Sequence, residues 1–386
     1  MTVPDVLPRE LPIALARDVA LPVDVHDERV DTPAVLVDLD VVDANIARFA
    51  GFSARGGLDL RPHAKTHKSV AIARRQLAAG AVGVAASGVT EAGALVAGGV
   101  PDVLLAYPLV GKRKLERVAR LLAGEAKVSL VSDSPAVTGG YRALAESIGR
   151  ALPILVEVDT GMHRVGASPA DVVKVASEIA REPMLEFRGI LTHAGDSHDA
   201  PDEPGIQEVA RREAAIMGSL RADLEAAGLE VPVVSAGSTI TAPYLSAADG
   251  ITEIRPGTYI YNDLRTLGRF ACTPDAIAAS VLATVVNVDG PKVTVDAGSK
   301  TLTSSAHPVY GHGQLRDRPR STFTRVSEEH GVLRIDDDAP RPVVGDKVEI
   351  LPIHVCVWMD LQPEVYGVRR GRIVERIAVD AMRHSL

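Results

Sequence analysis

The feature that most constrains the fold is a repeated alternation of short apolar runs with alanine-rich amphipathic stretches, beginning near residue 58. The runs that we predict as strands cover residues 58–62, 82–86, 102–107, 127–132, 153–159, 187–193, 232–237 and 251–257. The segments between them show helical periodicity, and residues 208–228 form the longest example. Eight strands alternating with helices favour a parallel (β/α)8 TIM barrel over an open sheet.

The last third of the chain has a different pattern. Residues 278–386 are rich in Val, Thr, Gly, Asp and Pro and contain short runs such as "KVTVDAG" and "RIVERIAV". We therefore expect an N-terminal extension over residues 1–30, a barrel over 31–270 and a C-terminal β-rich domain over 271–386. A further strand is expected at 33–40, before the barrel proper, where it could join the β-rich domain together with the extension.

Composition limits the class of protein. The net charge of -8 and an aromatic content of 3% argue against nucleic acid and anionic membranes as partners. The first 20 residues lack the basic start and continuous apolar centre of a signal peptide, and no run approaches the ~18 apolar residues of a membrane span. Cys272 and Cys356 are too few for a disulfide framework. These features favour a cytoplasmic enzyme that acts on a small molecule.

Polar motifs follow several of the predicted strands, at the rim where barrel enzymes carry their chemistry. They are "RPHAKTHKS" (61–69), "DTGMHRVG" (159–166), "THAGDSH" (192–198), "GST" (237–239) and "RPGTY" (255–259). Each alone has an ordinary explanation, such as a solvated basic loop or a histidine satisfied within the core. Together they place a lysine, an arginine, a ring that can stack and two Gly-Ser/Thr loops at one rim. A pyridoxal phosphate site needs an amine, a phosphate cradle and groups that tune the ring.

The order and spacing of these motifs carry a family resemblance. From residue 31 to about 380 the sequence resembles the D-threonine aldolase and D-serine dehydratase family, which belongs to the alanine-racemase-like pyridoxal phosphate enzymes. The resemblance implies that Lys65 binds the cofactor as a Schiff base, that Arg164 contacts the phenolic oxygen and that His193 lies against the pyridine ring. It also implies that Arg255 faces the ring nitrogen. The phosphate would be held by Gly237, Ser238, Thr239, Gly257 and Thr258.

A second constellation lies near the C-terminus. The run "LPIHVCVW" (351–358) places His354 and Cys356 two residues apart, so in a strand both side chains would point to one face. Such a pair is most often structural, but the resemblance implies a divalent metal beside the cofactor. Thiolate plus imidazole favours Zn²⁺, with Mn²⁺ or Mg²⁺ as the alternatives. The family's usual Asn-Leu-x-Asp run is replaced here by "MDLQPE", with Asp360 and Pro363, so the substrate stays open.

The resemblance implies a lyase acting on 3-hydroxy-D-amino acids, with two possible outcomes. If Lys65 removes the α-proton, the β-hydroxyl leaves as water, and D-serine gives pyruvate and ammonia. If His193 or a metal-bound water takes the hydroxyl proton, the Cα–Cβ bond breaks, and D-threonine gives glycine and acetaldehyde. Cys356 resembles the ligand of the zinc-dependent dehydratases and favours the first outcome.

Two other functions compete with a lyase. An amino-acid racemase needs a second base, normally a tyrosine early in the C-terminal domain, and residues 278–300 contain no tyrosine. A non-catalytic pyridoxal phosphate carrier resembles the barrel alone, which would leave the second domain and the His354–Cys356 pair without a purpose. The resemblance also implies a homodimer, because related enzymes complete their sites across a dimer.

Overall fold

The computed structural model describes residues 14–335 and 341–384, which form two compact units. The barrel unit contains residues 41–277, 355–363 and the chain from 378 onward. The β-rich unit contains the chain up to residue 40 together with 278–354 and 364–377. The N-terminal residues 1–13, on which the absence of a signal peptide was predicted, lie outside the described residues.

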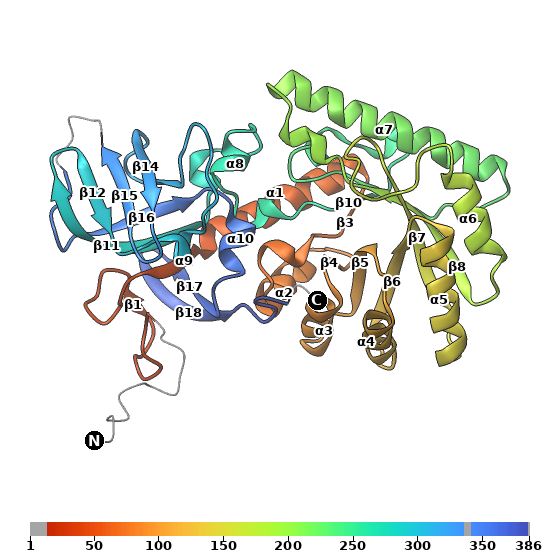
Figure 1. The fold of residues 1–386 in the computed structure, drawn as a ribbon, viewed down its shortest axis with the longest axis horizontal. Helices are drawn as coiled ribbons and strands as arrows, with labels where there is room; N and C mark the ends of the chain where they lie inside the picture. Colours follow the sequence, from red (N-terminus) through yellow and green to blue (C-terminus); the bar gives the residue numbers. More distant parts are fainter. Residues whose placement is uncertain (1–13, 336–340, 385–386) are drawn as a thin grey trace. The chain divides into compact units, whose positions relative to one another are not determined.

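The barrel unit contains a sheet of eight parallel strands in the order β3-β10-β9-β8-β7-β6-β5-β4 (Figure 1). Their bounds are β3 Asp59–Leu60, β4 Val84–Ala86, β5 Asp102–Pro108, β6 Lys127–Ser132, β7 Leu152–Val158, β8 Leu185–Thr192, β9 Val233–Ala236 and β10 Glu253–Ile254. The ring closes between its first two strands, where Val82 N–H donates to the Leu60 carbonyl (2.9 Å) and His63 bridges to Ala85. All eight predicted strands and the (β/α)8 architecture are confirmed.

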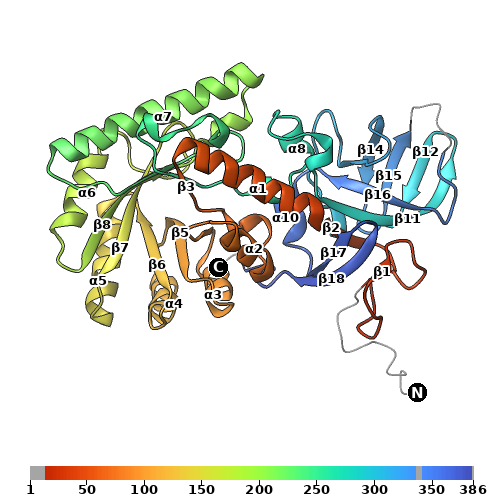
Figure 2. The ribbon, with the colours of Figure 1, turned by 180° about the vertical axis from the view of Figure 1, so that it is seen from behind.

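The helices of the barrel unit follow the strands in alternation. They are α1 Leu39–Gly56, α2 Val70–Ala78, α3 Val89–Ala97, α4 Lys112–Leu122, α5 Pro135–Ile148, α6 Val172–Arg181, α7 Glu203–Ala226 and the short α8 Leu264–Leu267. Figures 1 and 2 show α3, α4 and α5 on the outer side of the strands. The helix predicted at 208–228 is confirmed as α7. Among the described residues, no helix is both long and apolar enough to span a bilayer.

The interior of the barrel is layered. Ala85, Leu104, Val131, Leu155 and Leu191 come from five neighbouring strands and form a buried apolar cluster. Side chains alternate along a strand, so the residue two positions later also points inward, one layer closer to the carboxyl ends. The residues two positions further along are Ser87, Ala106, Asp133, Glu157 and His193, and Ser87, Asp133 and His193 lie just past the ends of their strands. The fold therefore replaces an apolar layer by a polar one at the rim where the motifs lie.

The β-rich unit is built on a 10-stranded sheet with the main order β1-β18-β17-β2-β11-β12-β15-β14. Its strands are β1 Val23–Asp24, β2 Ala34–Asp38, β11 Ala279–Asp289, β12 Lys292–Val295, β13 Gly313–Leu315, β14 Ser321–Val326, β15 Gly331–Ile335, β16 Lys347–Pro352, β17 Glu364–Arg369 and β18 Arg372–Ala378; the helix α9 spans Ser299–Leu302. The strand expected at 33–40 is β2, which pairs with β11 and β17.

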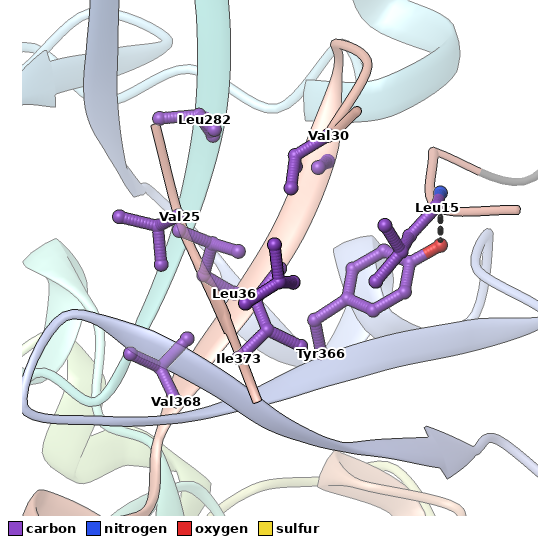
Figure 3. Packing of buried hydrophobic residues seen from close by; sticks show 10 residues of the cluster. Leu15, Val25, Val30, Leu36, Leu282, Tyr366, Val368 and Ile373 are labelled. Atoms are coloured by element: carbon purple, nitrogen blue, oxygen red, sulfur yellow. Dashed lines mark hydrogen bonds between the residues drawn. The ribbon is translucent and has the colours of Figure 1, made fainter. Parts of the chain in front are cut away.

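One apolar cluster joins the N-terminal segment to this sheet. Leu15, Val30 and Leu36 pack with Tyr366 and Ile373, and all five are at most 3% exposed (Figure 3). The Leu15 N–H donates to the Tyr366 hydroxyl (3.1 Å), so the ring's polar tip is satisfied as well. Burial of each large apolar side chain contributes about 2 kcal/mol, which fixes the segment on the sheet.

The strand predicted through residues 351–358 is wrong in its second half. Strand β16 ends at Pro352, and Val355–Met359 form the one-turn helix α10. The Val355 N–H donates to the Asp263 carboxylate (3.1 Å), which starts a helix in place of a strand ladder. A short apolar run does not distinguish a strand from a buried helical turn. His354 and Cys356 therefore do not share the face of a strand.

Candidate active site

The two lysines of the motif at 61–69 have different surroundings. After β3 the chain makes the short helix η1 (Ala64–Thr66), in which the His63 ring accepts a hydrogen bond from the Lys65 N–H (3.4 Å). Lys68 is buried, and its ammonium donates to Asp360 (2.6 Å). The Lys65 amine makes no hydrogen bond or ion pair within the described residues. Lys65 is therefore the lysine of this motif whose amine is left for a ligand.

The histidine that ends β8 is uncharged at neutral pH. Burial, followed by the positive charges of Lys65, Arg255 and Arg164, lowers the pKa of His193 to about 3. The pKa of His63 is lowered well below its usual value by burial and by Lys65 and Arg255. Since both rings respond to the same cations, the structure brings Lys65, His193 and Arg255 into one neighbourhood.

Arg255 is held rigidly at the end of β10. Its guanidinium donates to the Ser235 hydroxyl (2.5 Å) and to the Thr192 carbonyl. The same hydroxyl donates to Glu253 (2.5 Å), so it links a carboxylate to the guanidinium. Burial lowers the pKa of Arg255, and the carboxylates of Glu253, Glu157 and Glu213 oppose that shift. Arg255 is thus a fixed cation inside the barrel.

The two Gly-Ser/Thr loops contain free backbone donors. The Gly237 N–H donates to Glu213 (3.1 Å) and the Ser238 N–H donates to Thr241 Oγ1 (2.9 Å), so both are already engaged. Among the described residues, the N–H groups of Thr239, Gly257 and Thr258 have no acceptor. These three donors, on two adjacent loops, are a cradle of the kind that binds a phosphate.

Glycine is required at two points of this cradle. Gly237 has φ +78°, which turns the chain sharply at the end of β9. At Gly257 a Cβ would lie 3.1 Å from Thr66 Oγ1 and 3.3 Å from His63 Cβ. The loop after β10 therefore approaches the loop of Lys65 closely, and a side chain at Gly257 would require its neighbours to shift by a few tenths of an ångström.

Two buried carboxyl groups were missed from the sequence. Glu157 and Glu213 each have an Oε2 atom without a hydrogen-bond partner, and burial raises both pKa values to about 7. Glu157 could have been found, because it lies two positions beyond the inward-facing Leu155. Glu213 also carried a signal, since it interrupts the buried face of α7 between Val209 and Met217.

Arg164 lies on the loop after β7 and is exposed. It makes no hydrogen bond within the described residues, but its charge lowers the pKa values of Glu157 and His193. Those effects place its guanidinium within electrostatic range of the polar layer. The structure therefore puts Arg164 near the other site residues without fixing its position.

Cys356 belongs to the same rim. Its Sγ lies 3.2 Å from Thr66 Oγ1 and 3.8 Å from Thr258 Oγ1. Burial raises the pKa of the thiol, while the nearby Lys65 opposes that rise. Among the described residues no cluster of three or more His, Cys, Asp or Glu side chains could hold a metal. A metal at Cys356 would therefore have few protein ligands and several open positions.

A free amine, a neutral imidazole, a fixed guanidinium and three free N–H groups converge at the carboxyl ends of a (β/α)8 barrel. Such a set of groups can hold a phosphorylated carbonyl cofactor. Residues 37–264 match the family model "Alanine racemase, N-terminal domain", and residues 278–368 match "Putative serine dehydratase domain". The chain belongs to the D-threonine aldolase and D-serine dehydratase family of alanine-racemase-like, pyridoxal phosphate-dependent lyases.

Individual relatives cover nearly the whole chain. A D-threo-3-hydroxyaspartate dehydratase from Delftia sp. (strain HT23) is 36% identical over 84% of this chain and 91% of the relative. A D-threonine aldolase from Arthrobacter sp. is 33% identical over 90% of this chain and 92% of the relative. A D-threo-3-hydroxyaspartate dehydratase has also been solved in a metal-free form with a cysteine replaced by alanine; that structure superimposes with a TM-score of 0.84, 32% identity, and coverage of 90% and 97% of the two chains.

Proposed function

We propose that the chain is a pyridoxal phosphate- and divalent metal-dependent lyase that eliminates water from 3-hydroxy-D-amino acids. The observation that carries this proposal is the position of Cys356. Its sulfur lies against Thr66, the neighbour of Lys65, and against Thr258, one of the three free phosphate donors. A metal held by this thiol would therefore share one site with the cofactor.

The residues present fit the cofactor. The N–H groups of Thr239, Gly257 and Thr258 would hold the phosphate, and the Lys65 amine would bind the carbonyl carbon. Bound there, pyridoxal phosphate supplies an electron sink for the bonds at the substrate's α-carbon. Arg255 would face the ring nitrogen, where a fixed cation keeps that nitrogen unprotonated and limits side reactions. Arg164 would contact the phenolic oxygen, and the neutral ring of His193 would lie against the cofactor.

The residues also fit a metal. His354 and Cys356 would be its protein ligands, a donor set that favours Zn²⁺ over Mn²⁺ or Mg²⁺. A bound divalent ion supplies a Lewis acid for the β-hydroxyl. Two solved variants of a D-threo-3-hydroxyaspartate dehydratase replace a histidine and a cysteine that are two residues apart, which is the spacing found here.

The surroundings of the two candidate bases, Lys65 and His193, favour elimination over aldol cleavage. Lys65 Nζ makes no hydrogen bond or ion pair within the described residues and can take the α-proton. Loss of that proton and of the β-hydroxyl as water, followed by hydrolysis of the enamine, gives a 2-oxo acid and ammonia. Aldol cleavage instead needs a base for the hydroxyl proton, and the pKa of about 3 makes His193, the protein side chain considered for that role, a poor one.

D-Threonine aldolase activity is the second candidate, because the Arthrobacter aldolase is almost as similar to this chain as the Delftia dehydratase. Product analysis separates the two. Cofactor-loaded, zinc-replete protein would be given D-serine, D-threonine, D-threo-3-hydroxyaspartate and the L-enantiomers, with and without EDTA. We expect 2-oxo acid and ammonia from the D-substrates, lost with EDTA and restored by Zn²⁺.

Other products would revise the assignment. Glycine plus an aldehyde would identify an aldolase, and interconversion of enantiomers insensitive to EDTA would identify a racemase. Cofactor binding without turnover of any of these substrates would identify a carrier. We also propose a homodimer, following the resemblance, and light scattering of the purified protein at about twice the mass of 40.7 kDa would support it.

A further inference from the structure

The C-terminal segment up to residue 384 returns to the barrel unit and meets the loop of Lys65. The Ala381 N–H donates to the Lys68 carbonyl (3.0 Å), and the Asp380 carboxylate accepts the Val70 N–H (2.7 Å). Val70 begins α2, whose N-cap residue Ser69 makes no side-chain cap bond. Asp380 therefore caps α2 from a distant part of the sequence, and it ties the C-terminal segment to the lysine loop.

Lys68 combines two unfavourable features that this packing must offset. It is only 6% exposed, and it has φ +49°, which is uncommon for a residue with a side chain. Its ammonium pairs with Asp360 at 2.6 Å. The same carboxylate oxygen accepts the Arg383 N–H (2.8 Å), so the C-terminal segment also fixes the partner of Lys68. A buried charge in a strained backbone persists when its surroundings determine it.

Asp360 directly follows α10, the helix that contains Cys356. The first residue of α10 is anchored by Asp263, which accepts the Val355 N–H (3.1 Å). The far end is anchored by Asp360 through Lys68. Between these two anchors α10 packs on η1, and Cys356 touches Thr66. The ion pair thus joins the segment that contains Lys65 to the segment that contains the thiol.

We propose that the Lys68–Asp360 ion pair is a positioning element that holds Cys356 at the loop of Lys65, so that the metal and cofactor sites form one unit. This inference rests on the proposed function, because it assigns a metal to Cys356. Asp360 is one of the residues that replace the family's usual Asn-Leu-x-Asp run, and the ion pair with Lys68 gives this residue a structural role. Glu91 is a further carboxylate within electrostatic range of Lys68, but within the described residues the ammonium is paired with Asp360.

The test measures Zn²⁺ affinity of the full-length, cofactor-loaded protein by competition with a chromophoric chelator. We expect Asp360→Asn and Lys68→Met each to weaken Zn²⁺ binding about tenfold, in the range typical of residues that orient metal ligands. The double variant should be no weaker than either single one, because both remove the same interaction. Asp360→Glu keeps the carboxylate and should recover most of the affinity.

The matched control is Glu182→Gln, which breaks the exposed Arg142–Glu182 pair of the same unit and should leave Zn²⁺ affinity unchanged. Wild-type affinity in both single variants would overturn the inference, even if their melting temperatures fall. Additive losses in the double variant would also overturn it. Absence of Zn²⁺ binding to the wild-type protein would instead reject the metal site of the proposed function.

Discussion

The polar groups at the two ends of the barrel differ in whether they are paired. At the amino ends of the strands, Arg61 pairs with Glu253 (2.7 Å) and with Asp102 (2.6 Å). These charges satisfy one another beside a cavity of about 530 Å³. At the carboxyl ends, the Lys65 amine, three backbone N–H groups and two carboxyl oxygens have no partner in the part of the chain that the structure describes. We propose that the unpaired groups, and not the cavity, mark the active site.

The two ends are joined by one chain of hydrogen bonds. Glu253 accepts from Arg61 on one side and from Ser235 on the other, and Ser235 accepts from Arg255. The paired end therefore fixes the cation of the unpaired end. Polar groups buried without partners cost free energy, and that cost is recovered when a ligand supplies the missing bonds. The comparison predicts that substitutions at the unpaired end reduce activity, while those at the paired end reduce stability.

The largest effect is expected at Lys65. Lys65→Ala removes the amine that would bind the cofactor and move the α-proton, and it should lower kcat by about 1,000-fold. The matched control is Lys127→Ala, which removes a lysine that lines the cavity at the paired end. Its activity should stay within about twofold of wild type. Comparable losses in the two variants would break the distinction between the ends.

The second effect concerns the two cysteines. Cys356→Ser removes a direct metal ligand. It should therefore weaken Zn²⁺ binding by about 100-fold, the upper limit of the losses seen when a residue that orients a metal ligand is replaced. Cys272→Ser makes the same chemical change at a partly buried thiol whose pKa is raised to about 11 by desolvation, and it should leave metal content unchanged. Metal analysis after dialysis measures both. Equal zinc contents in the two variants would remove Cys356 from the site.

The third effect tests the paired end. Arg61→Met leaves Asp102 and Glu253 without their cation, which should lower the free energy of unfolding by about 2 kcal/mol after allowance for partial solvent screening. Chemical denaturation of the cofactor-free protein measures this loss. Cofactor affinity should change little, because Ser235 and Thr192 still hold Arg255. A large loss of cofactor affinity would show that the hydrogen bonds from Arg61 through Glu253 and Ser235 to Arg255 couple the two ends, so that the ends do not act independently.

The smallest effect is a pH dependence at the unpaired end. The pKa of Glu213 rises from 4.5 to about 7 because of burial, so the folded protein binds its proton more tightly than the unfolded chain. Stability from this group is present below pH 4.5 and is lost as the pH rises to about 7. Glu213→Gln should therefore stabilise the cofactor-free protein by about 1 kcal/mol at pH 8 and by less at pH 5. Equal effects at both pH values would contradict the assignment.

The architecture could be predicted from the sequence because periodicity reports which side of an element is buried. All eight barrel strands followed from apolar runs between helical stretches, and even the two-residue β3 and β10 were placed correctly. The strand predicted through Cys356 was wrong because Val355–Met359 is short and apolar, and a tertiary contact with Asp263 decides its conformation. No local pattern in the sequence reports that contact.

The candidate site was predictable in its motifs but not in its pairings. The sequence offered two lysines in "HAKTHK", and only the structure shows that Lys68 is committed to Asp360. Likewise, "GST" suggested a phosphate loop, yet the N–H groups of Gly237 and Ser238 are engaged within the protein. Glu157 and Glu213 could have been inferred from strand alternation and from the apolar face of α7. Their unpaired oxygens could not, since these depend on residues distant in sequence.

The most direct test identifies the residue to which the cofactor is covalently attached. The protein would be loaded with pyridoxal phosphate, reduced with borohydride, digested and analysed by peptide mass spectrometry. We expect a single phosphopyridoxyl group on Lys65, with Lys68 unmodified because its ammonium is buried and paired with Asp360. Modification of Lys68 in place of Lys65, or no stable adduct on either lysine, would contradict the claim that the unpaired end of the barrel is the cofactor site.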